Sequence, residues 1–542
     1  MGGTLSRLFA RAVAFAETRA GTATVFLVAF TVWWIQAIAI PLAGGRDFGT
    51  YLGAYDQLFR SDPIDLGYVL GRTPIAPLVT GALLDPFGGA LAEPAMALLY
   101  AASLTAWFLA ARRFGGAAAL LTAVILLAYP SYGILFHELG SDAVFAAAFA
   151  GWSLLAVRVL EAPSTRGFAL LGAGVAVLAL VRPLNQVLIV LGVLALVIGA
   201  PWRRRLVWAA AFVVPVVLIL GAWTVHNGVR FGDYTVSRAG NTNWPIYRVY
   251  LFDKIVRPDN GPASREVSQA VQEDLLPFAP YRAYGITLEQ FFAEPSARML
   301  EDLGALSNRR WGWDSDQKIL RDIAFEAIRT HPRAYASGVA STVWGLLRKP
   351  VFRPLGSGGG DGEGDGGARG IGPTVVVDGR VLPLPSEGEA IPAAREGGVT
   401  TPDGSIHTVW TSPYEHHLVF DHPGDEERYA ALHSRISELA SGLPDRAGAA
   451  TLALRLNQAS RWYPPPVLWL VVGMVALAVR RPARLLALSA PTLAALIVVI
   501  LAALGAPAIP HFSVPVTPAF ALLAAGALLG PRRPGGTESS VV

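Results

Sequence analysis

The sequence of 542 residues contains no cysteine, which excludes disulfide bonds and any chemistry that depends on a thiolate. Charged residues are also scarce: they make up 15% of the chain, whereas about a quarter is usual for a soluble domain. The formal net charge of +4 is too small to indicate a nucleic-acid partner, and no internal repeat is visible. Hydrophobic residues reach 53%, so we predict an integral membrane protein with polar segments between its spans.

Ten apolar runs approach or exceed the roughly 20 residues that a membrane-crossing helix needs. The first is predicted to be an anchor and not a cleaved signal, because Glu17 and Arg19 precede it and no cleavage site is evident. The runs lie at about 21–43, 91–111, 115–133, 141–159, 167–182, 184–199, 205–224, 465–479, 485–504 and 513–530.

The distribution of basic residues supports this count. When the ten spans alternate across the bilayer, every basic cluster falls on one side, and the positive-inside rule identifies that side as the cytoplasm. These clusters are Arg7, Arg11 and Arg19; Arg112 and Arg113; Arg158 and Arg166; Arg203 to Arg205; Arg480, Arg481 and Arg484; and Arg532 and Arg533. We therefore predict a multi-pass protein of the plasma membrane with both termini in the cytoplasm.

The remaining segments are expected on the outer side. Two further apolar runs, from Thr73 to about Phe87 and from about His331 to Phe352, are predicted to be interfacial helices. Residues 375–381 predict a hairpin with Asp378-Gly379 as its turn, and a helix is predicted from about Glu426 to Leu443. The expected fold is an all-α polytopic membrane protein with a small mixed α/β extracytoplasmic region. Its predicted parts are an N-terminal transmembrane catalytic module (1–224), an extracytoplasmic segment with an interfacial helix (225–355), a Gly/Asp-rich linker (356–372), a small extracytoplasmic domain (373–464) and C-terminal transmembrane helices (465–542).

Polar side chains are predicted to gather at the outer membrane surface. A carboxylate there can accept a proton from an attacking hydroxyl, and cations can stabilise a departing phosphate, for which the guanidinium fork is well suited. The alternatives are a snorkelling turn residue for Arg182, an N-terminal helix acid for Glu138 or Asp142, and a hydrogen-bonded interface residue for His511. The set comprises Asp47, His137, Glu138, Asp142, Arg182, Asn185, His226, Asn227, Arg230 and His511.

Four short segments carry a resemblance to a known family. They are Asp47-Phe-Gly-Thr-Tyr51 followed by Arg72-Thr-Pro-Ile-Ala-Pro77, then Leu139-Gly-Ser-Asp142-Ala-Val-Phe145, then Ala222-Trp-Thr-Val-His-Asn-Gly-Val-Arg-Phe-Gly232, and finally Pro510-His-Phe-Ser-Val-Pro515. Together they resemble the GT-C superfamily of polyprenyl-phosphate-sugar glycosyltransferases, above all the protein O-mannosyltransferases and the aminoarabinose transferase of lipid A. Three departures stand out: Phe48 occupies the place of a second acid, and His226 and His511 stand where arginine is usual.

The resemblance implies about ten transmembrane helices in a GT-C-type arrangement and an inverting transferase. The donor would be a polyprenyl-phosphate sugar and the acceptor a hydroxyl of a glycan, lipid or protein. Asp47 would be the catalytic base, and Glu138 or Asp142 would orient the acceptor or a divalent cation. The donor phosphate would be bound by Arg182, His226, Arg230 and His511. The substrate cleft would include Tyr51, Arg72, Asn227, Trp311 and Trp313, with residues 241–247 beside the acceptor.

Other functions are also open at this point. A lipid-linked sugar flippase or transporter would need acids in mid-span and an internal repeat, and the three departures leave room for an inactive membrane scaffold. Trp311 and Trp313 are alternatively interfacial anchors. His407, Glu415, His416, His417, Asp421 and His422 form a cluster whose spacing fits no zinc signature, so a solvated loop is the alternative to a metal site. The stretch that begins at Asp361 lacks the final glutamate of a calcium loop and is predicted to be linker.

Overall fold

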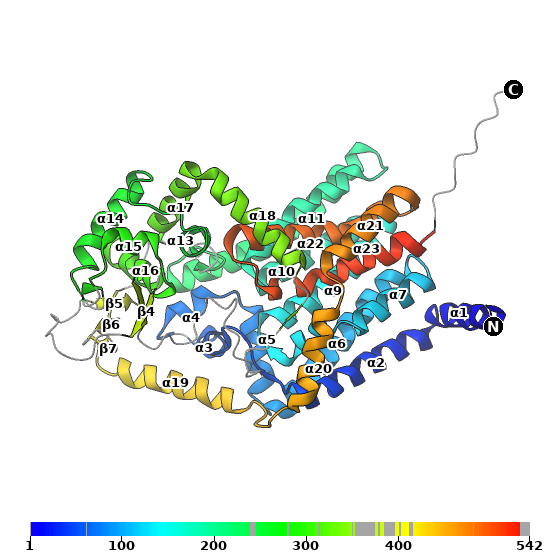
Figure 1. Ribbon diagram of the computed structural model, residues 1–542, viewed down its shortest axis with the longest axis horizontal. Coiled ribbons are helices and arrows are strands. Elements are labelled where there is room, and N and C mark those ends of the chain that lie inside the picture. The colour runs from blue at the N-terminus through cyan, green and yellow to red at the C-terminus, as the bar shows by residue number, and fades with distance from the viewer. Residues whose placement is uncertain are drawn as a thin grey trace.

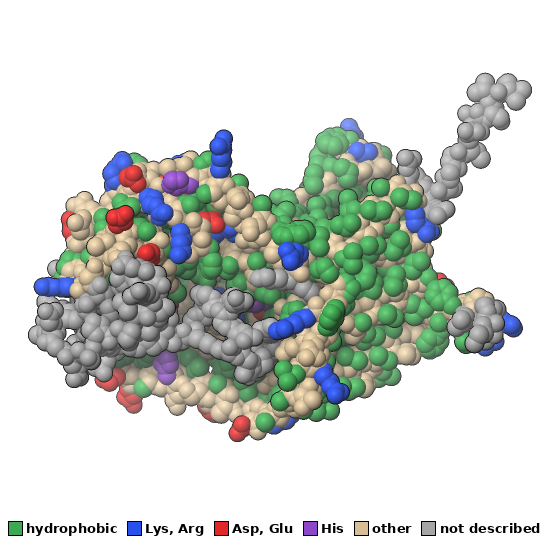
Figure 2. All heavy atoms as spheres, in the orientation of Figure 1, with side chains coloured by type: hydrophobic (Ala, Val, Ile, Leu, Met, Phe, Trp, Pro, Cys, Tyr) green, Lys and Arg blue, Asp and Glu red, His purple; other side chains and the backbone are tan. Residues whose placement is uncertain are grey.

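Long helices form one part of the molecule, and shorter helices and strands lie at one end of them (Figure 1). The structure is a computed structural model, and it describes residues 2–60, 62–238, 245–278, 281–282, 285–312, 315, 317–348, 351–352, 374–377, 380–383, 396–399, 401, 403–410, 416–480 and 482–531. Hydrophobic side chains cover much of the surface over the long helices, whereas charged side chains gather mainly near the two ends of the molecule (Figure 2).

The membrane part combines helices from both ends of the chain. The helices α22 and α21 pack on α23, which packs in turn on α7, and α22 also contacts α9. The N-terminal half contributes α2 (Arg19–Ala39), α6 (Gly89–Arg112), α7 (Gly116–Leu127), α8 (Pro130–Ile134), η1 (Leu135–His137), α9 (Ser141–Glu161), α10 (Thr165–Val181), η2 (Pro183–Val197) and α11 (Trp202–Phe231), preceded by α1 (Gly2–Ala16). The C-terminal part contributes α20 (Ala450–Trp462), α21 (Pro466–Arg480), α22 (Leu485–Gly505), η5 (Pro510–Phe512), η6 (Val514–Val516) and α23 (Thr517–Leu529).

Every predicted span has a helical counterpart, but not every counterpart has the length of a crossing helix. Among the described residues, seven helices are long and apolar enough to cross a membrane, and the count is eight if the bent pair of α7 with α8 and η1 is one span. The chain is thus a polytopic membrane protein of helical fold. The helices α10 and η2 are shorter, so the count of ten stays a prediction.

The helix η2 compensates for its short length by its winding. Its 15 residues form a 3₁₀-helix, which rises about 2.0 Å per residue. The same residues wound as an α-helix would cover only about 22 Å. The 3₁₀ winding brings the length to about 30 Å, close to the thickness of the hydrocarbon core.

The loop between α2 and α6 contains three helices that rest on the membrane part. They are α3 (Phe48–Leu58), α4 (Leu66–Gly71) and α5 (Ile75–Leu84), and they follow the short strand β1 (Ala43–Gly44). The strand β1 pairs in parallel with β2 (Glu138–Leu139), so the start of this loop lies beside the start of α9. The helix α5 was predicted from the run that begins at Thr73, and it packs against α3 and α6.

A helical layer with a core of its own lies between α11 and α18, and the sequence had not indicated it. Its helices are α13 (Ile246–Leu251), α14 (Pro262–Asp274), α15 (Leu288–Ala293), α16 (Ala297–Trp311) and α17 (Lys318–Thr330), followed by α18 (Pro332–Arg348). Arg248 joins the layer to the membrane part: it is 2% exposed, pairs with Asp253 at 2.8 Å and donates to the carbonyls at the end of α22. Buried backbone carbonyls and a carboxylate thus satisfy the buried guanidinium.

The small β region agrees with the prediction where it is described. The strands β3 (Thr374–Val377) and β4 (Arg380–Pro383) pair antiparallel with Val377 opposite Arg380, which confirms the hairpin. A three-stranded sheet follows, formed by β5 (Glu396–Val399), β6 (Ile406–Trp410) and β7 (His416–Phe420). The predicted helix is α19 (Asp425–Ser441). The predicted linker 356–372 lies outside the described residues.

Asp65 is a buried acid at the start of α4. Its Oδ1 accepts a hydrogen bond from the amide of Gly67 at 2.8 Å, so the side chain caps the helix. Burial raises the pKa of this carboxyl to about 6, and the hydrogen bonds from Gly67 and Tyr68 offset only part of that effect. The folded protein therefore binds a proton at Asp65 between about pH 4 and pH 6 that the unfolded chain does not, so stability falls as the pH rises through this range.

We expect D65N to stabilise the protein at neutral pH, because asparagine caps a helix as well as aspartate does and carries no charge. The gain over the wild type should be near zero at about pH 4 and reach about 1 to 3 kcal/mol at pH 7.5. The measurement is the midpoint of thermal unfolding of both proteins in detergent between these pH values. A difference that does not change with pH would contradict the assignment.

Candidate functional site

The site is built where two short strands bring distant loops together. The amide of Gly45 donates to the carbonyl of Leu139 at 2.9 Å, which extends the pairing of β1 with β2 by one residue. A Cβ on Gly45 would lie 3.0 Å from that carbonyl and 3.2 Å from Oε2 of Glu138, so the close approach favours glycine. As a result, Asp47 lies two residues beyond this contact and Asp142 three residues beyond it.

Asp47 has a backbone conformation that few residues other than glycine adopt. Its φ is 60° and its ψ is 19°, in the left-handed region where aspartate and asparagine are the best tolerated side chains after glycine. It occupies the N-cap position of α3, yet its side chain makes no capping hydrogen bond. Instead Oδ2 pairs with Arg72 at 3.0 Å, and the Arg72 guanidinium lies over the ring of Tyr51 at 5.6 Å. The carboxylate is 39% exposed and thus accessible.

Arg182 forms the second half of the site with Asp142. The two side chains form an ion pair and are 16% and 14% exposed. Nε of Arg182 donates to Oγ of Ser141 at 3.3 Å, and one terminal nitrogen donates to the carbonyl of His511 at 3.4 Å. The ring of Phe145 lies 5.1 Å from the guanidinium, which completes a tightly packed environment for this cation.

The two halves form one charged cluster. Asp47 and Tyr51 lie close enough to Arg182 to act on its guanidinium electrostatically, and Arg46 and Arg182 lie close to His511. The cluster therefore contains three arginines, two aspartates and a histidine, contributed by the starts of α3 and α9, the ends of α4 and α10, and η5. Such an arrangement can hold an anion between cations and place a carboxylate next to it.

Glu138 and His137, which precede Ser141 and Asp142 in the chain, are buried side chains. Glu138 is 5% exposed and has interaction partners of its own. His137 is fully buried, and its ring stacks on Trp33 with centroids 4.4 Å apart. Both residues are thus packed at the start of β2, and the Glu138 side chain lies against Gly45 rather than facing solvent.

Two predicted site residues lie at the other end of α3. Arg230 donates to the carbonyl of Leu58 at 3.0 Å and to that of Arg60. The His226 ring stacks on Trp223, which packs on the apolar cluster around Leu58. Because α3 has 11 residues, its two ends are about 16 Å apart. The structure therefore does not bring Arg230 or His226 together with Asp47.

Asn227 and the predicted tryptophans also have other surroundings. Asn227 is buried and donates to the carbonyl of Thr235 at 2.8 Å, which secures the turn after α11. Nε1 of Trp311 donates to Glu266 at 2.7 Å within the helical layer. Trp313 and residues 241–244 lie outside the described residues.

Some residues of the cluster escaped the sequence analysis. Arg46 precedes Asp47, Ser141 precedes Asp142, and Phe512 follows His511, with its ring 5.9 Å from the Arg182 guanidinium. Ser141 and Phe512 stand inside two of the four segments that carry the family resemblance, so those segments were the available signal. Arg46 lies outside all four, and only its position before Asp47 could have indicated it.

The metal site weighed for the histidine-rich segment stays a prediction, because the side chain of His416 is among those that the structure does not describe. Nδ1 of His407 lies 2.9 Å from the carbonyl of Gly404, and His422 pairs with Asp403 at 3.4 Å. Within the described part of the chain, no three histidine or acidic side chains gather closely enough to hold a metal ion. Glu415 lies outside that part.

The fold and the site define a polytopic membrane protein with a charged cluster at one end of its long helices. Residues 86–225 match the family model of dolichyl-phosphate-mannose-protein mannosyltransferase. This match confirms the resemblance to the protein O-mannosyltransferases over a segment that contains Asp142 and Arg182.

Other comparisons add little. Among solved structures, the chain is similar to the crystal structure of ArnT from Cupriavidus metallidurans bound to undecaprenyl phosphate. The similarity covers 94% of this chain and 78% of that chain, with 15% sequence identity and a TM-score of 0.34. No curated protein matched the sequence.

We expect R182M to destabilise the protein by about 3 to 5 kcal/mol, because it leaves the Asp142 carboxylate without its partner in a poorly solvated place. The double variant D142N/R182M should recover part of this loss. The control is K318M, which breaks an exposed pair with Asp322 and should cost at most about 1 kcal/mol. Thermal unfolding in detergent measures all three, and equal stability of R182M and K318M would contradict the assignment.

Proposed function

We propose that the protein is an inverting glycosyltransferase that moves a sugar from a polyprenyl-phosphate donor to a hydroxyl acceptor on the extracytoplasmic face. The observation that carries the proposal is the pairing of β1 with β2, which brings Asp47 close to the ion pair of Asp142 with Arg182, although 135 residues separate Asp47 from Arg182 in the sequence (182 minus 47). The match of residues 86–225 to the mannosyltransferase family supports the class of donor.

Asp47 is proposed as the general base. Its Oδ2 faces Arg72, which fixes the orientation of the carboxylate and leaves Oδ1 for the acceptor hydroxyl. The hydroxyl gives its proton to Asp47 while its oxygen attacks the anomeric carbon. The bond from that carbon to the phosphate oxygen breaks on the opposite face, so the configuration inverts and polyprenyl phosphate leaves.

Arg182 is proposed to bind the phosphate. A guanidinium has five N–H donors, and the described partners Ser141, His511 and Asp142 engage one donor on each of its three nitrogens. One N–H then remains on each terminal nitrogen, and two parallel donors suit two phosphate oxygens. Arg46 and Arg72 add positive charge nearby. His511 would contribute its backbone carbonyl by orienting Arg182, and Asp142 would serve the same purpose.

The orientation in the membrane is part of the proposal. Arg113 and Arg484 both pair with Glu161 at the C-terminal end of α9. Asp142 lies at the other end of this 21-residue helix, about 30 Å away. The positive-inside rule places the arginine-rich end in the cytoplasm, and the cluster then faces the outside.

We expect D47N to lower the turnover number at least about 100-fold, because the amide cannot accept the proton. Asparagine is the informative substitution since it tolerates the left-handed backbone and leaves the shape unchanged. Binding of undecaprenyl phosphate should stay within about twofold of the wild type. D56N, in the same helix, is the control and should retain activity. Full activity of D47N would overturn the assignment.

A donor screen tests the proposal as a whole. Purified protein is incubated with radiolabelled polyprenyl-phosphate sugars, with and without candidate acceptors. A transferase releases free lipid phosphate when an acceptor is added, whereas a flippase or an inactive scaffold does not. Absence of release across the panel would count against the transferase.

A further inference from the structure

The strands β6 and β7, the helix α19 and residues 442–449 run along the outer face of the first loop. We call this group the clasp. It lies outside residues 86–225, the segment that matches the mannosyltransferase family. Its partners are α3, α4, α5 and the start of α6, and α3 carries Asp47 at its first turn.

The clasp rests on the loop through a small apolar cluster. Ile64 of the loop, Ile406 of β6 and Leu432 of α19 are all buried and belong to one apolar cluster. The amide of Ile64 donates to the side chain of Gln57 in α3 at 2.7 Å. The apolar anchor of the clasp is therefore tied directly to the helix that begins at Asp47.

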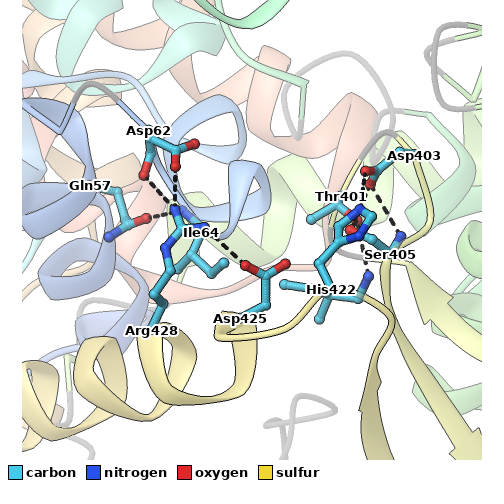
Figure 3. Close-up of polar contacts among 10 residues, drawn as sticks. Gln57, Asp62, Ile64, Thr401, Asp403, Ser405, His422, Asp425 and Arg428 are labelled. Atoms are coloured by element: carbon cyan, nitrogen blue, oxygen red, sulfur yellow. Dashed lines mark hydrogen bonds and ion pairs between the residues drawn. The ribbon is translucent and has the colours of Figure 1, made fainter.

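One face of α19 carries the polar contacts. Arg428, Leu432, Arg435 and Leu439 follow at intervals of four, three and four residues, which places them on the same side of the helix. Arg428 pairs with Asp62 at 2.7 Å and with Asp425 of its own helix at 2.9 Å. Figure 3 shows Arg428 between these two carboxylates, with Gln57 turned toward Ile64.

Arg435 reaches α3 through a shared carboxylate. Its guanidinium pairs with Asp85 at the end of α5. The other oxygen of Asp85 accepts a hydrogen bond from the Tyr55 hydroxyl at 2.9 Å, and Tyr55 belongs to α3. Arg435, Asp85 and Tyr55 thus join α19, α5 and α3 in one chain of contacts.

The residues after α19 attach the C-terminal end of the clasp to the start of α6. Arg446 pairs with Glu93 of α6 through both oxygens of the carboxylate. The amide of Gly89 donates to the carbonyl of Gly442 at 2.6 Å, and a Cβ on Gly88 would lie 2.8 Å from this oxygen. This close approach, together with the positive φ of 54° at Gly88, requires glycine there.

We propose that the clasp holds α3 in the position in which Asp47 meets Arg182, and that Arg435 and Arg446 are the positioning residues that lock it. The inference rests on the proposed function for the step that Asp47 performs, but the fixation of α3 can be measured without activity. The side chains of Arg435 and Arg446 are 31% and 43% exposed, so each pair is weak alone. Locking then requires both pairs together with the apolar cluster.

The test compares the wild type with R435Q/R446Q, which removes both locks, and with R435K/R446K, which keeps both charges. The control is R455Q, because Arg455 is an exposed arginine of α20 for which the described residues provide no ion pair. Hydrogen exchange measured by mass spectrometry reports on the amides of α3. Transfer kinetics and binding of undecaprenyl phosphate are measured on the same preparations.

We expect the glutamine variant to exchange the α3 amides at least about five times faster and to lose about tenfold in turnover number. Binding of undecaprenyl phosphate should stay within twofold, because Arg182 lies outside the clasp. The lysine variant should recover at least half of both losses, and R455Q should match the wild type. If the double glutamine variant does not fold, R435Q alone gives the same comparison with a smaller change.

Two results would overturn the inference. One is wild-type exchange of α3 in the glutamine variant, and the other is a lysine variant that behaves like the glutamine variant. A failure of the proposed function has a different signature, since the wild type itself would then show no transfer. The exchange data would still decide whether the clasp fixes α3.

Discussion

The ion pair between Arg182 and Asp142 is the interaction on which the candidate site depends. A guanidinium at the edge of the hydrocarbon core is costly unless a carboxylate and hydrogen-bond acceptors surround it. Ser141 and the carbonyl of His511 supply those acceptors from two different helices. The pair therefore joins the start of α9 to the junction of α10 and η2, with η5 beside them, and the loop between α2 and α6 is arranged around them.

The backbone places the catalytic candidate by a separate device. Two residues of β1 pair with two residues of β2, and the left-handed conformation at Asp47 then turns the chain into α3. A strained backbone at an accessible carboxylate that makes no capping bond is typical of a functional position. Two elements contact α3 in this position: Arg230 of α11 donates to the carbonyls at its far end, and α19 packs against it.

Much of the fold could be predicted because the membrane restricts it. Apolar runs of sufficient length and the arginines between them located the counterparts of α2, α6, α9, α11 and α22, and an Asp-Gly turn located the β3–β4 hairpin. The layer from α13 to α17 was missed. Its helices are short and amphipathic, and their apolar faces are buried against one another rather than in lipid. Hydropathy alone cannot distinguish such a layer from a loop.

The sequence by itself determined which residue types stand at the ends of the spans, and it singled out Asp47, Asp142 and Arg182. Only the tertiary structure decided which of the arginines lie close to Asp47. Arg46, Arg72 and Arg182 lie in its cluster, whereas Arg230 binds backbone carbonyls about one helix length away. The reason is physical: a charge pattern along the chain fixes the end of the membrane helices at which a residue lies. Which side chain or carbonyl that residue contacts at this end depends on the long-range packing of α3, α9 and α11.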